Sequence, residues 1–369
     1  MSGVRGASVV FRADASLQIG TGHLMRCLAL ATALREQGAT CRFVCRAHVG
    51  HLADVVRGHG FGITLLPRSP GDGARHTTTA HDDWLGESWP GDAEQTSATL
   101  AGERADWIVV DHYALEQGWE SSLRGHAARM LVIDDLADRP HDCDLLLDQN
   151  LGRAPDDYAA LVLAGCGLLV GPTFALLRPE FARLRMRSLS RRGTPVLRQL
   201  LITLGGVDAG NATCAVLGAL RECELPADLH ICVAMGAQAP ALAAVRDLAG
   251  RMPWTTDVLV DVKDMATLMA DSDLAIGAAG ATAWERCCVG LPTLLFVLAA
   301  NQVAGARALH TSGAALSLGD PSSIARTLPE AMRHCAQEGV LARLSAAAAR
   351  VTDGGGVARV LDRMAACSG

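Results

Sequence analysis

Short apolar runs alternate with longer segments of helical periodicity through the first half of the chain. The run at residues 7–11 is followed by Leu24, Leu28 and Leu34, which recur at helical spacing up to an expected helix end at Gly38. This alternation predicts a parallel sheet with helices on both faces. The expected strands of this half are residues 7–11, 40–45, 63–66, 107–111, 130–134, 145–148 and 168–171.

The pattern restarts after an arginine-rich stretch at residues 183–198. This stretch contains Gly193 and Pro195 and shows little periodicity, so we expect a linker there. Two similar α/β domains follow, residues 1–192 and residues 193–369. The expected strands of the second domain are residues 200–204, 229–234, 256–260, 274–277 and 293–296.

One polar segment interrupts the first domain. Residues 68–97 are rich in Gly, Pro, His, Asp, Thr and Ser. We expect a surface loop there, anchored by Trp84 and Trp89, that is able to cover a site.

Composition narrows the class of protein. With 369 residues, 50% of them hydrophobic and 20% charged, the chain has the make-up of a compact two-domain enzyme. A net charge of −6 argues against general attraction to nucleic acid and leaves a small anionic metabolite compatible. No apolar run is long enough for a membrane anchor and no signal sequence is recognisable, so we expect a cytoplasmic protein. The twelve cysteines lack paired metal-ligand spacing, and Cys27 is expected to pack rather than to act as a nucleophile.

The segment Gly20-Thr-Gly22-His23 lies where the first strand passes into the first helix. Two glycines let the backbone approach a ligand closely, and the start of a helix suits an anionic group. An imidazole at that position is kept neutral by the helix dipole, as a general base near neutral pH requires. The alternative is that His23 only caps the helix.

Polar residues also follow two other strands of the first domain. Asp111 is expected to orient either His23 or His112. The hydroxyl of Tyr113 is placed to hold a sugar group or a water molecule, with a packed core tyrosine as the alternative. Asp134 and Asp135 form a candidate Mg²⁺ pair, but adjacent residues at a strand end point in opposite directions and one commonly caps a turn, which argues against a metal.

In the second domain, Gly205 and Gly206 form a turn at a strand end and allow close backbone approach. Asp208 and Asn211 follow directly. We expect both of them to cap the next helix rather than to meet a ligand.

A second turn of small residues, Gly280-Ala281-Thr282, leads into a helix expected to begin near Ala281, whose amides suit a pyrophosphate. Glu285 is placed to accept hydrogen bonds from ribose hydroxyls, and the alternative is a glutamate that caps its own helix. Asn301 and Gln302 follow the next strand, where an amide pair contacts phosphate, uracil or sugar, or merely ties down a loop.

Together these segments resemble the UDP-2,4-diacetamido-2,4,6-trideoxy-β-L-altropyranose hydrolases of pseudaminic acid biosynthesis. The resemblance runs through most of the chain and keeps the order and spacing of the motifs. Two departures are the long polar segment at 68–97 and Ala281, where a serine is common. The matching stretches are residues 12–14, 20–23 with Arg26, 111–113, 134–135, 141–147, 171–181, 205–208, 280–285 and 301–302.

The resemblance implies a GT-B fold, with two Rossmann-like domains, a central cleft, and UDP held mainly by the second domain. It also implies an inverting reaction without metal or cofactor, in which His23 takes a proton from water, the water attacks the anomeric carbon and UDP leaves. Tyr113 and Asn301 are expected near the sugar and the reacting water. The residues expected to contact substrate or UDP are Arg12, Asp14, Gly20, Gly22, Gly205, Gly206, Gly280, Ala281, Thr282, Glu285 and Gln302.

Two other functions stay open at this stage. A GT-B glycosyltransferase uses the same nucleotide site to pass a sugar to an alcohol, and fold alone does not separate the two reactions. A non-catalytic UDP-sugar-binding protein needs no base at His23. The identity of the sugar rests on the resemblance alone.

Overall fold

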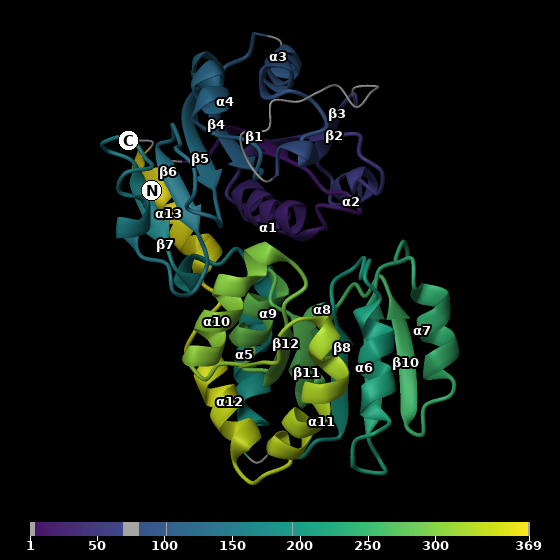
Figure 1. Ribbon diagram of the computed structural model, residues 1–369. Helices are drawn as coiled ribbons and strands as arrows, with labels where there is room; N and C mark the ends of the chain where they lie inside the picture. The colour runs from purple at the N-terminus through teal and green to yellow at the C-terminus, as the bar shows by residue number, and fades with distance from the viewer. Residues whose placement is uncertain (1–3, 69–80, 101, 194, 368–369) are drawn as a thin grey trace. The chain divides into compact units, whose positions relative to one another are not determined.

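The computed structural model describes residues 4–68, 81–100, 102–193 and 195–367 (Figure 1). The chain divides into two compact units. Unit 1 consists of residues 1–176 and 356–369, and unit 2 of residues 177–355. Each unit is an α/β domain built on its own parallel sheet, as the alternating pattern predicts.

Unit 1 contains a seven-stranded sheet in the order β3-β2-β1-β4-β5-β6-β7, and every neighbouring pair is parallel. All seven strands expected in this half are present, with ends that differ by up to three residues. The strands are β1 Ser8–Ala13, β2 Thr40–Arg46, β3 Gly62–Leu66, β4 Ala105–Asp111, β5 Ala127–Ile133, β6 Leu145–Asp148 and β7 Gly167–Val170. The helices are α1 Gly22–Glu36, α2 Ala53–Gly58, α3 Trp89–Leu100, α4 Gln117–Leu123 and α13 Gly356–Cys367, with short 3-10 turns η1 Asp82–Trp84, η2 Arg124–His126, η3 Pro155–Tyr158 and η4 Pro172–Phe174.

Both faces of this sheet are covered, so its central strands are apolar at consecutive positions. Val9 and Phe11 of β1 belong to one apolar cluster, which includes residues of α1 and α13. Val10, between them, faces the other cluster together with Trp119 of α4. The polar residues that follow the strands therefore gather at the carboxyl edge of the sheet.

Unit 2 contains a six-stranded parallel sheet in the order β10-β9-β8-β11-β12-β13. The five expected strands are present, and β13, only two residues long, was not expected. The strands are β8 Gln199–Thr203, β9 His230–Met235, β10 Thr255–Val260, β11 Leu274–Ala278, β12 Thr293–Phe296 and β13 Leu316–Ser317. The helices are α5 Pro179–Ser190, α6 Ala212–Leu220, α7 Leu242–Ala249, α8 Met265–Asp271, α9 Thr282–Cys288, α10 Val303–Thr311, α11 Ile324–Cys335 and α12 Val340–Ala349, with 3-10 turns η5 Ala300–Gln302 and η6 Pro321–Ser323.

The division between the units differs from the expected boundary at residue 192. Helix α5 lies before that residue and packs on α8 and α9, so it belongs to unit 2. The last helix, α13, returns to unit 1, where it packs on α1 and η4. Figure 1 shows this yellow helix among the purple and teal elements of unit 1. The arginine-rich stretch therefore lies partly in a packed helix of unit 2 and does not mark the boundary between the units.

The expected surface loop at residues 68–97 is wrong in its second part. Residues 69–80 lie outside the described residues, but helix α3 begins at Trp89 and buries Asp92 completely. The Asp92 carboxylate accepts hydrogen bonds from the guanidinium groups of Arg12 (3.1 and 2.7 Å) and Arg46 (2.5 Å) and from the indole of Trp119 (3.0 Å). Asp92 therefore joins α3 to strands β1 and β2 and to helix α4.

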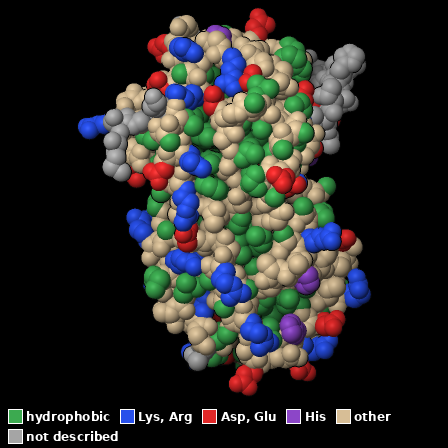
Figure 2. Space-filling view, turned by 90° about the vertical axis from the view of Figure 1, so that its left-hand side faces the viewer, with side chains coloured by type: hydrophobic (Ala, Val, Ile, Leu, Met, Phe, Trp, Pro, Cys, Tyr) green, Lys and Arg blue, Asp and Glu red, His purple; other side chains and the backbone are tan. Residues whose placement is uncertain are grey.

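Charged side chains of both signs are dispersed over the face drawn in Figure 2. None of the helices in the described ranges combines the length and the apolar character needed to cross a lipid bilayer.

We expect the substitution Asp92→Ala to lower the free energy of unfolding by about 3–5 kcal/mol, because it removes a carboxylate shared by two buried guanidinium groups, of which Arg12 still pairs with Asp14. Chemical denaturation of both proteins measures the difference. Glu94→Ala, an exposed acidic residue on the same helix, is the control and should change stability by less than about 0.5 kcal/mol. Equal stability of the two variants would contradict the central role of Asp92.

Candidate functional site

His23 lies in the first turn of α1, directly after the turn that leaves β1. Gly20 closes that turn: its backbone φ is +82°, its N–H donates to the carbonyl of Ser16 (2.9 Å), and Ser16 Oγ accepts from the N–H of Ile19 (2.9 Å). Gly22 is the first helical residue. The small residues of this segment therefore bring the helix start to the carboxyl edge of the sheet, as the sequence predicts.

The carboxylate of Asp111, at the end of β4, holds His23 and Arg26 together. Nδ1 of His23 lies 2.6 Å from one carboxylate oxygen, while Arg26 donates to both oxygens (2.6 and 2.7 Å). Burial opposes ionisation of Asp111, but the charge of Arg26 and the contact with His23 outweigh it and hold the pKa of the carboxyl well below its ordinary value. Asp111 therefore orients His23, which settles the choice between His23 and His112.

This contact fixes the proton on the imidazole ring. An ionised carboxylate only accepts hydrogen bonds, so Nδ1 must donate and Nε2 carries the lone pair of a neutral ring. Within the described part of the chain no group hydrogen-bonds Nε2, and the His23 side chain is 9% exposed. A nearly buried histidine with a free basic nitrogen is equipped to take a proton, and the side chain does not cap its helix.

Tyr113 stands against this imidazole. The two rings meet edge to face with centroids 4.6 Å apart, and Trp84 stacks on Tyr113 at 5.6 Å. The phenol donates to Asp135 (2.8 Å), which also pairs with Arg26 (2.8 Å). His23 and Tyr113 are thus linked through Asp111, Arg26 and Asp135, and these contacts restrict the orientation of both rings.

The candidate Mg²⁺ pair diverges, as expected. Asp134 accepts from the N–H of Ala137 (2.8 Å) and from the phenol of Tyr158 (3.0 Å), whereas Asp135 faces Arg26. Among the described residues, no group of three or more His, Cys, Asp or Glu side chains is gathered in a way that could hold a metal ion. Cys27 is buried, and burial raises the pKa of its thiol well above the ordinary value, as a packed residue requires.

Arg12 and Asp14, for which the resemblance implies substrate contacts, lie buried at the end of β1, and their role in binding stays a prediction. Their side chains are fully buried and pair with each other at 2.7 Å. Asp14 also accepts the N–H of Arg46 (2.6 Å) and lies 3.5 Å from Nε2 of His112. Burial lowers the pKa of His112 to about 3, so this ring is neutral. These contacts join the end of β1 to β2 and to the segment that follows β4.

In unit 2, the turn after β8 has Gly205 at φ +94°. The carbonyl of Gly206 accepts the N–H of Gly236 at 2.9 Å, and a Cβ on Gly236 would lie 2.5 Å from that oxygen. Asp208 accepts the N–H groups of Ala212 and Thr213 (both 2.9 Å), and Asn211 accepts that of Cys214 (3.4 Å). The prediction that these two polar residues cap α6 is confirmed.

The second turn of unit 2 joins β11 to α9. Glu285 pairs with Arg178 (3.1 Å) and is not hydrogen-bonded to its own helix start, so the capping alternative does not hold. Burial raises the pKa of Glu285 above its ordinary value although Arg178 opposes this. Gln302 accepts the N–H of Leu298 (3.0 Å), which is the loop-tying alternative, and its Nε2 lies 3.5 Å from where a Cβ on Gly280 would be. Asn301 is exposed on η5.

Three residues of these arrangements were not assigned roles from sequence. Arg26 and Arg178 stand in matched motifs, but their acidic partners, Asp111 and Glu285, lie 85 and 107 residues away in the sequence, so no local pattern indicates these ion pairs. Asp135 was considered as a metal ligand, with the capping of a turn by Asp134 or Asp135 as the alternative. Its contacts with Arg26 and Tyr113 join segments far apart in sequence, and no local pattern reports them.

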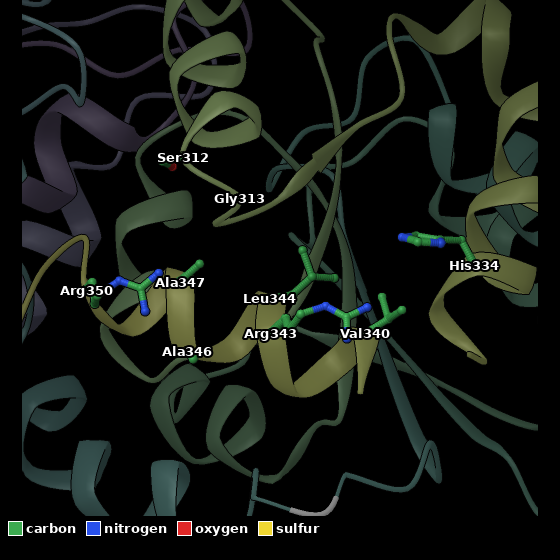
Figure 3. A pocket seen from close by; sticks show the side chains of 9 residues that line it. All are labelled: Ser312, Gly313, His334, Val340, Arg343, Leu344, Ala346, Ala347 and Arg350. Atoms are coloured by element: carbon green, nitrogen blue, oxygen red, sulfur yellow. The ribbon is translucent and has the colours of Figure 1, made fainter. Parts of the chain in front are cut away.

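A groove of about 460 Å³ lies elsewhere on unit 2 (Figure 3). His334 and Arg343 line it together with apolar side chains of α12. None of the residues expected at the site contributes to its lining, so it is not the candidate site. The lining residues are Ser312, Gly313, His334, Val340, Arg343, Leu344, Ala346, Ala347 and Arg350.

Comparison with known proteins finds one family match and several similar proteins. Residues 200–355 match the glycosyltransferase family 28 C-terminal domain. The chain is 24% identical over 268 residues to UDP-2,4-diacetamido-2,4,6-trideoxy-beta-L-altropyranose hydrolase of Campylobacter jejuni, an alignment that covers 73% of this chain and 83% of that protein. It is 32% identical over 149 residues to the spore coat polysaccharide biosynthesis protein SpsG of Bacillus subtilis, covering 40% of this chain and 43% of that protein.

Solved structures establish the fold class. MurG of Acinetobacter baumannii superposes with a TM-score of 0.69 at 18% identity, covering 97% of this chain and 99% of that one. The fold is GT-B, with two Rossmann-like domains, as the resemblance implied.

We expect Asp148→Asn to stabilise the protein increasingly as the pH rises from 5 to 8. Burial and the neighbouring Asp135 raise the pKa of Asp148 to about 7 in the folded protein, whereas the unfolded chain ionises it near pH 4. The folded state therefore holds the extra proton between these values, and the wild-type protein loses stability across that range as the pH rises. An asparagine has no proton to lose.

The measurement is the melting temperature of variant and wild type at pH 5, 6, 7 and 8. Asp156→Asn, at an exposed position of η3, is the matched control and should follow the wild type throughout. A difference between Asp148→Asn and wild type that is constant with pH would refute the prediction.

Proposed function

We propose that this protein hydrolyses UDP-2,4-diacetamido-2,4,6-trideoxy-β-L-altropyranose to UDP and the free sugar, by attack of water at the anomeric carbon with inversion. The observation that carries the proposal is the 2.6 Å contact between Nδ1 of His23 and Asp111, which leaves Nε2 as a base. The similarity to the Campylobacter jejuni hydrolase supports the choice of substrate.

In the proposed reaction, Nε2 of His23 takes a proton from water as the water oxygen bonds to the anomeric carbon. The bond between that carbon and the diphosphate oxygen breaks, and UDP leaves with the electron pair. The imidazole becomes an imidazolium, which the ionised Asp111 stabilises through Nδ1. Tyr113 and Asn301 are assigned to the sugar and the water, and no metal takes part.

UDP is assigned to unit 2. Gly205, Gly206, Gly280 and Ala281 would let the backbone approach the diphosphate, and Thr282 would donate its hydroxyl to it. Glu285 would accept from the ribose hydroxyls, with Arg178 keeping its carboxylate in place. Gly20, Gly22 and Gln302 complete the proposed contacts with the substrate.

A glycosyltransferase is the second candidate, because residues 200–355 match a glycosyltransferase domain. The same base would then activate an acceptor hydroxyl instead of water. Turnover without an acceptor separates the two, since a transferase releases UDP only slowly when no alcohol is supplied.

We expect purified protein, incubated with the UDP-sugar in ¹⁸O-water and no acceptor, to release UDP steadily and to place the label in the free sugar. His23→Asn should lower kcat by about 10²-fold or more, because the base is lost, while UDP affinity is kept. Mass spectrometry of both products and calorimetry with UDP give these values.

His59→Asn, at an exposed position of unit 1, is the control for this variant and should turn over as the wild type does. Label in UDP would show attack at phosphorus. Unchanged turnover in His23→Asn would remove the proposed base, and absence of turnover without acceptor would favour the transferase.

We expect Glu285→Ala to weaken UDP binding by about tenfold or more, because hydrogen bonds from hydroxyls to a carboxylate each contribute about 1.5–3 kcal/mol. Calorimetric titration with UDP measures the change. Glu222→Ala, an exposed acidic residue of the same unit, should leave the affinity unaltered. Unaltered affinity in Glu285→Ala would reject the assignment to ribose.

A further inference from the structure

The guanidinium of Arg286 is buried beneath the turn between β11 and α9, with the residue 1% exposed. Nη2 donates to the carbonyl of Ala278 (2.6 Å) and Nη1 to Oγ1 of Thr282 (3.1 Å). Nε is buried and has no hydrogen-bond partner. Within the described ranges, no carboxylate lies within ion-pair distance of Arg286, and Glu285, its neighbour in sequence, pairs with Arg178.

The fold makes room for this charge. A Cβ on Gly277 of β11 would lie only 2.6 Å from Nη1, so a glycine is needed where the guanidinium packs. Burial lowers the pKa of Arg286 to about 10, which still leaves it charged at neutral pH. A buried cation without a counter-charge is costly, and an anion bound nearby would repay part of that cost.

The two hydrogen bonds donated by Arg286 also determine which polar groups of the turn remain available to a ligand. Because Thr282 Oγ1 accepts from Arg286, the hydroxyl hydrogen is free to be donated elsewhere. The carbonyl of Ala278 is held by the same guanidinium, so its negative end is neutralised. Both effects favour an acceptor-rich, negatively charged ligand above the turn.

We infer that Arg286 is a positioning residue for the diphosphate of a nucleotide bound at residues 277–282, which it serves through Thr282 and through its charge and not by direct contact. This rests on the proposed function, and it adds that the turn recognises the diphosphate more than the nucleoside.

The test compares UDP with uridine, which lacks the diphosphate, by calorimetric titration of the full chain. Arg286→Met should weaken UDP binding by about tenfold or more and change uridine binding by less than about twofold. Arg286→Lys, which keeps the charge, should recover part of the loss. Thr282→Val should weaken UDP binding as well, and its effect should shrink in the Arg286→Met background because the two residues act in series.

Arg192 supplies a matched control in the same unit. Its guanidinium is also buried and its pKa is also lowered to about 10 by burial, but Nε, Nη1 and Nη2 all donate, to carbonyls that include those of Val289 and Ser272. Arg192→Met should lower the melting temperature without altering the ratio of UDP to uridine affinity.

Each outcome of these titrations either supports or contradicts the role of Arg286. An equal loss of UDP and uridine binding in Arg286→Met, or no loss, would overturn the inference and leave the proposed function standing. If Arg286→Met does not fold, Arg286→Gln removes the charge in its place, and the same titrations compare it with Arg286→Lys. Wild-type protein that binds no UDP would overturn both.

Discussion

The buried ion pair between Asp111 and Arg26 is the constraint on which the candidate site of unit 1 depends. A carboxylate taken out of water stays ionised only if a cation and hydrogen bonds replace the lost hydration. Arg26 supplies both and still leaves one oxygen 2.6 Å from His23. The ion pair thus creates an acceptor that fixes the tautomer of His23, and the second carboxylate bound by Arg26, that of Asp135, holds Tyr113.

The sequence predicts the positions of most strands. It predicts few of the contacts between side chains that are distant in the chain. Alternating apolar runs located nearly all strands because both sheets are parallel and buried on both faces. The two-residue strand β13 escapes such a pattern because it is too short to show one. Asp111 was predicted to orient a histidine, either His23 or His112, because strand ends and the following turns of a parallel sheet share one edge.

The rest could not be predicted because it depends on partners distant in the chain. Asp92 sits in a segment whose composition is typical of a loop, yet it is buried since Arg12 and Arg46, on two other elements, require its charge. Burial of Arg12 and Asp14 has the same origin. Helix α13 likewise belongs to unit 1 through its packing on α1, which no boundary signal in the sequence reports.

The buried charges differ between the two units in a way that suits the proposed reaction. In unit 1, Arg26 is matched by two carboxylates, so the surroundings of His23 can accept the positive charge that a base gains with its proton. In unit 2, Arg286 is satisfied by a carbonyl and a hydroxyl and keeps its charge uncompensated, which suits the negative charge that gathers on a departing diphosphate. Transfer of one proton and release of one anion require these opposite environments together, since neither alone stabilises both charges of the transition state.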